Sequence, residues 1–147
     1  MPIPTSRLLA VALFGVVSTA ALASTTSVVV FKRATCSCCE KWVEHLRTNG
    51  FEVQVLNVPA VSVERKRLGM PDRLASCHIG QVNGGYLVEG HVPAQDIRQL
   101  LAMHPKVLGV AVPSMAPGAP GMETTPSHPY ETLLVQTDGR TSIFAKH

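Results

Sequence analysis

The chain has 147 residues, a formal net charge of +3 at pH 7, and 46% hydrophobic against 16% charged residues. This composition excludes an intrinsically disordered chain and indicates one globular domain. The weak, scattered positive charge argues against a nucleic-acid partner, and 5% aromatic residues argue against stacking platforms for bases or sugars. The four cysteines and six histidines are therefore the informative part of the composition.

Residues 1–23 have the layout of a secretory signal peptide. Arg7 gives a positive start, residues 8–17 are an apolar run, and Ala21-Leu22-Ala23 matches a cleavage signal. We therefore expect cleavage after Ala23, a periplasmic location and a single mature domain over residues 24–147. The alternative is a membrane anchor, but the apolar stretch is shorter than the ~20 residues that span a bilayer. We expect no membrane span after cleavage.

Hydrophobic periodicity predicts alternating strands and helices in the mature chain. In chain order the predicted elements are strand 27–31, helix 40–49, strand 51–58, helix 61–68, strand 77–82, strand 86–89 and helix 93–104. Strands separated by helices favour parallel pairing, and the turn sequence at 83–85 predicts an antiparallel hairpin. This α/β order, β-α-β-α-β-β-α with a mixed sheet, resembles the thioredoxin fold.

The remaining C-terminal part predicts a loop and a second hairpin. Residues 113–122 are rich in proline and glycine and include Met115 and Met122, which is typical of an irregular loop. Residues 132–136 and 140–145 flank the turn sequence Thr137-Asp138-Gly139 and predict a closing β-hairpin.

Three of the four cysteines, Cys36, Cys38 and Cys39, lie within four residues. A disulfide inside so short a segment constrains little chain entropy, so the cluster indicates chemistry rather than a structural crosslink. Cys36 and Cys39 form a C-x-x-C pair where a strand leads into a helix, and a helix N-terminus favours the thiolate form. We expect Cys36 near the helix N-cap and Cys39 on the inward face. Such a pair fits a redox dithiol or a metal site.

Cys38, Cys77 and His78 favour the metal site. An extra adjacent thiol would invite scrambling in a dithiol enzyme, whereas a metal cluster gains from it. Thiolates with imidazole select Cu(I) or Zn(II) rather than hard cations. One zinc ion prefers four well-spaced ligands, but bridging sulfurs in a multinuclear Cu(I) centre tolerate crowding. We predict Cys36, Cys38, Cys39, Cys77 and His78 as metal ligands, with Cu(I) preferred and zinc second.

Strand geometry raises one difficulty for this ligand set. Successive side chains of a strand point to opposite faces, so Cys77 and His78 reach one site only if the strand begins after them or is bulged. His91 is a further candidate, either as a ligand or as a donor that supports one. Met115 and Met122 are candidate thioether ligands, although loop methionines often cover apolar surface. The other histidines are expected to be structural (His45, His104) or solvated (His128, His147).

Four segments carry a more specific resemblance. They are Cys36–Trp42, Leu74–His78, Val88–Ala94 and the loop motif Pro113-Ser114-Met115…Pro120-Gly121-Met122-Glu123. Together they resemble a family of exported C-x-C-C metal-binding proteins that includes the CopG-type copper-resistance proteins, over residues 27–147. The resemblance implies a thioredoxin-like fold and copper bound through clustered cysteines and histidine. It also implies copper redox, or hand-over to other periplasmic copper carriers or efflux components.

Three functions therefore compete. The first is a periplasmic copper-binding protein of copper resistance or homeostasis, with Cu(II)/Cu(I) redox handling. The second is a thiol–disulfide oxidoreductase that uses Cys36 and Cys39, against which stands the absence of a proline at Ser76 before the third strand. The third is a structural zinc module. The sequence favours a binding protein over an enzyme; an enzymatic activity would be oxidoreduction of copper or of protein thiols.

Overall fold

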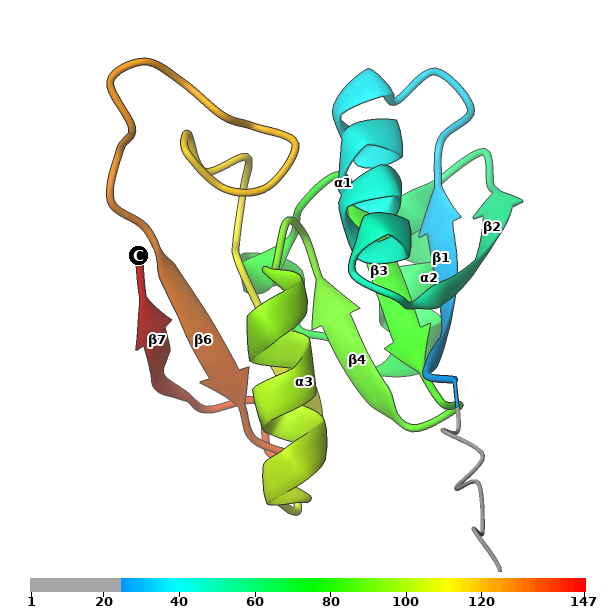
Figure 1. Ribbon diagram of the computed structural model, residues 1–147. Coiled ribbons are helices and arrows are strands. Elements are labelled where there is room, and N and C mark those ends of the chain that lie inside the picture. Colours follow the sequence, from blue (N-terminus) through cyan, green and yellow to red (C-terminus); the bar gives the residue numbers. More distant parts are fainter. Residues whose placement is uncertain (1–24) are drawn as a thin grey trace, which may run out of the picture.

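Seven strands form one mixed β-sheet in the computed structural model, which describes residues 25–147 (Figure 1). The predicted signal peptide lies outside the described residues, so its cleavage stays a prediction. Between residues 25 and 147, no helix has the length and apolar character needed to cross a membrane.

Most predicted elements are present with small shifts at their ends. The strands are β1 (Ser27–Lys32), β2 (Glu52–Asn57), β3 (His78–Val82), β4 (Tyr86–Glu89), β5 (Gly109–Ala111), β6 (Glu131–Val135) and β7 (Thr141–Lys146). The helices are α1 (Ser37–Thr48), α2 (Val61–Leu68) and α3 (Ala94–Met103), with a short 3₁₀ helix η1 (Asp72–Leu74). The first helix starts three residues earlier than predicted, so Cys38 and Cys39 lie in its first turn.

The sheet order is β2-β1-β3-β4-β5-β6-β7. The predicted parallel pairing is right for β1 with β2 but wrong for β3, which runs antiparallel to β1. The chain arrives from α2 and η1 beside the C-terminal end of β1, where His78 pairs with Lys32. Because β3 starts at that end, it runs back along β1 in the opposite direction. The first four strands and three helices are compatible with the predicted thioredoxin-like fold.

The C-terminal part extends this sheet instead of standing apart from it. The predicted hairpin is present as β6 and β7, and β5 joins it to the rest by pairing parallel to β4 and antiparallel to β6. Sequence periodicity missed β5 because three residues are too few to show alternation. The loop between β5 and β6 then lies above α3 and beside the N-terminal end of α1 (Figure 1).

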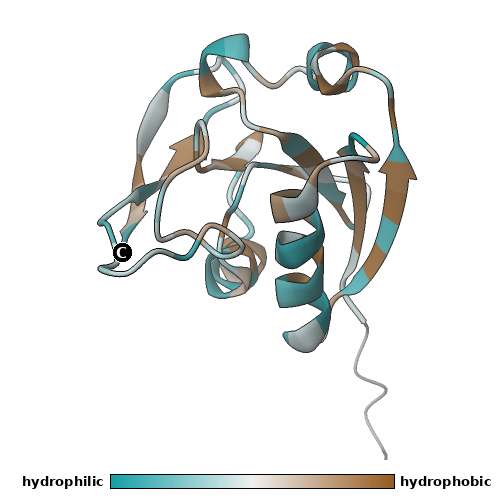
Figure 2. Ribbon diagram, turned by 90° about the horizontal axis from the view of Figure 1, so that it is seen from above, coloured by the Kyte–Doolittle hydropathy of each residue, from teal (hydrophilic) through white to brown (hydrophobic). Residues whose placement is uncertain are grey.

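Two apolar clusters cover the two faces of the sheet. One joins β1 to α1 and α3 and includes Trp42, Leu46 and Ile97, all fully buried. The other joins β3 to α2 and η1 through Ile79, Val61 and neighbouring residues. Figure 2 shows hydrophilic and hydrophobic residues on each helix, as expected for helices that pack on a sheet with one side and face water with the other. Both ends of the Cys36-to-Cys39 segment are thus attached to a packed framework.

The pairing of β5 with β4 yields a stability prediction. A Cβ atom at Gly109 would lie 1.9 Å from the carbonyl oxygen of Leu87, which belongs to the sheet backbone and cannot move away. We expect Gly109→Ala to lower the free energy of unfolding by about 1–3 kcal/mol, as overpacking does elsewhere. Urea unfolding measures it, with Gly85→Ala as control because its Cβ would meet nothing closer than 3.8 Å. Equal stability of the two variants would contradict the close approach.

Candidate metal centre

The N-terminus of α1 presents the cysteine cluster. Cys36 is the N-cap residue, and no side chain caps this end of the helix. Cys39 is fully buried beside Trp42, while Cys36 and Cys38 are partly exposed. The predicted placement of Cys36 at the cap and Cys39 on the inward face therefore agrees with the structure.

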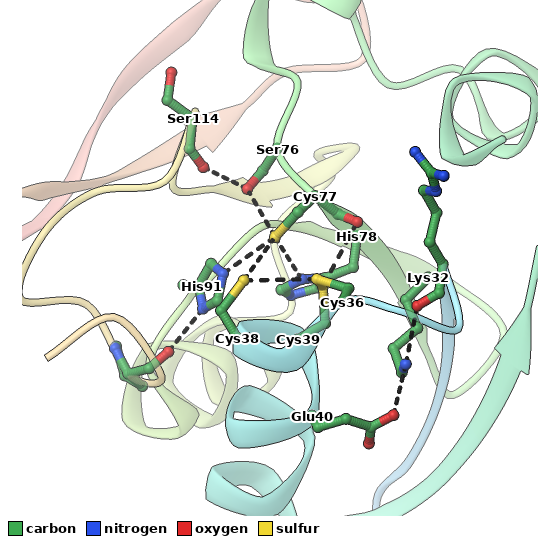
Figure 3. The surroundings of a disulfide bond; sticks show 12 residues. Lys32, Cys36, Cys38, Cys39, Glu40, Ser76, Cys77, His78, His91 and Ser114 are labelled. Atoms are coloured by element: carbon green, nitrogen blue, oxygen red, sulfur yellow. Dashed lines mark hydrogen bonds and ion pairs between the residues drawn. A yellow bond between two sulfur atoms is a disulfide. The ribbon is translucent and has the colours of Figure 1, made fainter.

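The turn before β3 brings the fourth cysteine to this helix end (Figure 3). The sulfur of Cys38 lies 3.5 Å from that of Cys36 and 3.9 Å from that of Cys77. The sulfur of Cys39 lies 3.7 Å from the carbonyl oxygen of Cys77. Two segments 38 residues apart in sequence thus place four cysteines around one point.

Two imidazoles complete the cluster around Cys77. Its sulfur lies 3.4 Å from Nδ1 of His78 and 3.2 Å from Nε2 of His91. Because β3 begins at His78, Cys77 precedes the strand and is free of strand alternation. This removes the difficulty that the sequence raised: both neighbours reach the same site.

A hydrogen bond at the ring nitrogen that does not face Cys77 fixes the orientation of His91. Its Nδ1 lies 2.8 Å from the carbonyl oxygen of Pro120, so Nδ1–H donates to that oxygen. This hydrogen bond leaves the lone pair of Nε2 directed at Cys77, an arrangement typical of histidines that ligate metals. The loop between β5 and β6 therefore takes part in shaping the site.

Burial keeps both imidazoles uncharged. It lowers the pKa of His78 well below its usual value, and the nearby His91 adds to the effect. Burial likewise lowers the pKa of His91. The ring of His78 lies against that of Trp42, with centroids 4.2 Å apart, and its buried Nε2 has no hydrogen-bond partner among residues 25–147. Neutral imidazoles can donate lone pairs to a metal ion without first losing a proton.

The thiols differ in their state. Cys36 and Cys39 are joined by a disulfide, and Cys38 and Cys77 are free. Burial, followed by the charge of Cys38, raises the pKa of Cys77 to about 11. A metal that binds Cys77 must therefore displace its proton, and binding to all four sulfurs also requires reduction of the disulfide.

The donor set fits a soft metal ion. Two groups have their ligand atoms within 4.8 Å of one another: Cys36, Cys38, Cys39 and Cys77 form one, and Cys77, His78 and His91 form the other. Cys77 belongs to both. Sulfur and imidazole donors without a carboxylate suit Cu(I) or Zn(II) and not Mg²⁺ or Ca²⁺. The predicted ligands thus lie together, and His91 joins them.

Comparisons with known proteins agree with this geometry. The family described as "Protein of unknown function, DUF411" matches residues 74–122, which hold Cys77, His78 and His91. The solved structure "Copper resistance protein copG- Form 2" is 37% identical over 84% of this chain and 98% of its own, with a TM-score of 0.78. The chain belongs to the CopG-like family. "Copper resistance protein copG- Form 1" is 38% identical over 82% of this chain and 96% of its own, with a TM-score of 0.76. No curated protein sequence gives a significant match.

The two methionines of the loop lie in different surroundings. Met115 is 54% exposed and lines a pocket of about 380 Å³ together with Ser76, Cys77 and Ser114. Met122 is partly buried and packs against the apolar cluster of α1 and α3. Met115 therefore lies beside the candidate centre, whereas Met122 packs in the core; the role of each as a ligand stays a prediction.

Among residues 25–147, the remaining histidines belong to neither donor group. His45 accepts a hydrogen bond from the backbone N–H of Ala94 at the start of α3, and His104 caps the end of that helix. Both are structural, as predicted, and His128 is exposed. His147 is exposed, as predicted, but it is not free of partners: its Nε2 lies 2.9 Å from the buried Asp96 carboxylate and its ring stacks on Tyr130.

Sequence reasoning missed the buried lysine behind the cysteines. Lys32, at the end of β1, is fully buried and pairs with Glu40 of α1 at 2.6 Å (Figure 3). Its ammonium group also donates to the carbonyl oxygen of Arg33. The pair ties the end of β1 to the first turn of α1 and so fixes the ends of the Cys36 loop. The available signal was a charged residue directly after the predicted strand 27–31.

The contact between the loop and α1 yields a second prediction. A Cβ at Gly121 would lie 2.9 Å from the carbonyl oxygen of Cys38 and 3.0 Å from the amide nitrogen of Trp42. We expect Gly121→Ala to lower the free energy of unfolding by about 1–3 kcal/mol more than Gly69→Ala does. Both glycines have φ near +85°, but a Cβ at Gly69 would meet nothing within 4 Å. Urea unfolding measures the difference, and equal losses would contradict the contact.

Proposed function

We propose that the chain is a periplasmic copper-binding protein of copper resistance or homeostasis, which holds Cu(I) in a cysteine–histidine centre. The observation that carries the proposal is the position of the Cys77 sulfur, 3.9 Å from Cys38 and 3.2 Å from His91. The sulfur of Cys77 thus lies next to the other cysteines on one side and to the two histidines on the other. The printed names of the two CopG structures support copper as the metal.

In this proposal the ligands are the five predicted residues and His91. Cys36, Cys38, Cys39 and Cys77 supply thiolates, and His78 and His91 supply neutral imidazole nitrogens. Four sulfurs in so small a volume favour a multinuclear Cu(I) centre, because a thiolate can bridge two ions and a tetrahedral zinc site cannot use all these donors. Zinc remains the competing metal, and Met115 and Met122 are additional candidate donors.

The Cys36–Cys39 disulfide supports a redox role for the same centre. Oxidation of the two thiols forms the S–S bond and releases two protons and two electrons. Two Cu(II) ions that each take up one electron become two Cu(I) ions, which Cys38, Cys77 and the imidazoles then bind. The reduced and oxidised forms would hold different amounts of copper.

Export and transfer partners belong to the same proposal. The signal-peptide pattern of residues 1–23 supports a periplasmic location. Copper bound at a partly exposed Cys38 is accessible to other periplasmic copper carriers or efflux components, which we propose as partners.

The second candidate function is thiol–disulfide exchange with other proteins. The disulfide at the N-terminus of α1, whose Cys36 is partly exposed and whose Cys39 is buried, favours it. Against it stands Cys38, whose free sulfur lies 3.5 Å from that of Cys36 and would compete with a substrate thiol.

Replacement of the shared cysteine separates these functions. We expect the reduced wild-type protein to hold two or more Cu(I) ions per chain against a competing chelator, and Cys77→Ser to hold fewer than half as many. Native mass spectrometry under anaerobic conditions counts the ions. His128→Ala is the control, since His128 is exposed and belongs to neither donor group among residues 25–147.

Two results would contradict copper binding as the function. One is a wild-type protein that holds one copper ion or none. The other is a metal-free protein that reduces insulin disulfides with Cys36 and Cys39 and is unaffected by Cys77→Ser, which would favour the oxidoreductase.

A further inference from the structure

A buried ion pair lies behind the turn that carries Cys77. Arg65 of α2 is 4% exposed and Glu89 at the end of β4 is fully buried. The guanidinium binds the carboxylate at two points, with Nε 3.1 Å from Oε2 and Nη2 2.8 Å from Oε1. Charged residues are almost never buried this fully unless paired, and burial of both charges carries a desolvation penalty.

The same pair holds both polar groups of the Ser76 backbone. The N–H of Ser76 donates to Oε1 of Glu89 at 2.6 Å, and Nη2 of Arg65 donates to the carbonyl oxygen of Ser76 at 2.8 Å. The Ser76 hydroxyl donates to the carbonyl oxygen of Ser114 (Figure 3). Ser76 is therefore held from α2, from β4 and from the loop after β5.

The residue held in this way immediately precedes Cys77. The carbonyl that Arg65 binds belongs to the peptide bond between Ser76 and Cys77, so its position sets the position of the Cys77 backbone. The Cys77 sulfur in turn lies between Cys38 and His91, at 3.9 and 3.2 Å. Neither Arg65 nor Glu89 contacts a sulfur or an imidazole of the centre among the interactions of residues 25–147.

We propose that Arg65 and Glu89 are positioning residues of the metal centre, which fix the Ser76–Cys77 peptide so that the Cys77 sulfur faces Cys38 and His91 together. This inference rests on the proposed function. The fork of the arginine is essential to it, because one guanidinium binds both the carboxylate and the Ser76 carbonyl, and the point charge of a lysine does not reproduce this geometry.

A double-mutant cycle on the reduced protein tests whether the pair acts through Cys77. We expect Arg65→Lys to weaken Cu(I) binding by about 10- to 100-fold, as loss of a group that orients a ligand typically does. In a Cys77→Ser background the same substitution should change the Cu(I) affinity less than about threefold, because the ligand that it positions is gone. Equal losses in both backgrounds would overturn the proposal.

Arg67→Lys is the matched control. Arg67 lies two residues along the same helix, is 56% exposed and pairs with Glu64, so its replacement should leave Cu(I) binding unchanged. Glu89→Gln is the second variant: it has the same shape and keeps an oxygen for the Ser76 N–H, but loses the charge that holds Arg65. We expect it to weaken Cu(I) binding in the same Cys77-dependent way.

A metal-free measurement keeps the test independent of copper. We expect Arg65→Lys to speed alkylation of Cys77 by a small uncharged reagent at least threefold, with the rate at Cys38 unchanged, as mapped by mass spectrometry. Unchanged alkylation of Cys77, or equal acceleration at both cysteines, would overturn the positioning role. If wild-type protein binds no Cu(I), the proposed function fails, while this alkylation result still decides whether the pair positions Cys77.

Discussion

The antiparallel pairing of β1 with β3 is the constraint on which the candidate centre depends. In this register Lys32 faces His78, so the first residue of β3 lies beside the last residue of β1, directly before the cysteine loop. A slip of one residue would reverse the face of every side chain in β3. Glycine at position 80 suits this register, because it leaves room between β3 and its neighbours. A Cβ at Gly80 would lie 3.3 Å from a methyl carbon of Val28 and 3.7 Å from the ring of Trp42.

Burial favours the uncharged form of three groups in the candidate centre, Cys77, His78 and His91. His78 and His91 are neutral, and the Cys77 thiol retains its proton at neutral pH. The fixed charges around it, Lys32 with Glu40 and Arg65 with Glu89, are instead neutralised in pairs. The framework therefore holds the donors in place without a metal. Under the proposed function a soft cation would replace the proton of Cys77 without a change in the charge of the two ion pairs.

Sequence periodicity predicted the parts of the centre that depend on local structure. The spacing of Cys39 and Trp42 gave the inward face of α1, and the strand-to-helix junction gave Cys36 as its cap. Periodicity could not predict that β3 runs antiparallel to β1, because an apolar pattern identifies a strand without giving its direction. The Pro120 carbonyl that orients His91 acts across 29 residues and leaves no residue-type signal, since any residue supplies a carbonyl.

Copper K-edge X-ray absorption of the reduced, Cu(I)-loaded protein tests most directly whether the two donor groups form one centre. We expect mostly sulfur neighbours around copper, a copper–copper scattering contribution from a sulfur-bridged cluster, and a nitrogen contribution that decreases in His91→Ala. Copper surrounded by nitrogen and oxygen without sulfur, or a spectrum that His91→Ala leaves unchanged, would contradict a centre built jointly from the cysteines of α1, Cys77 and His91.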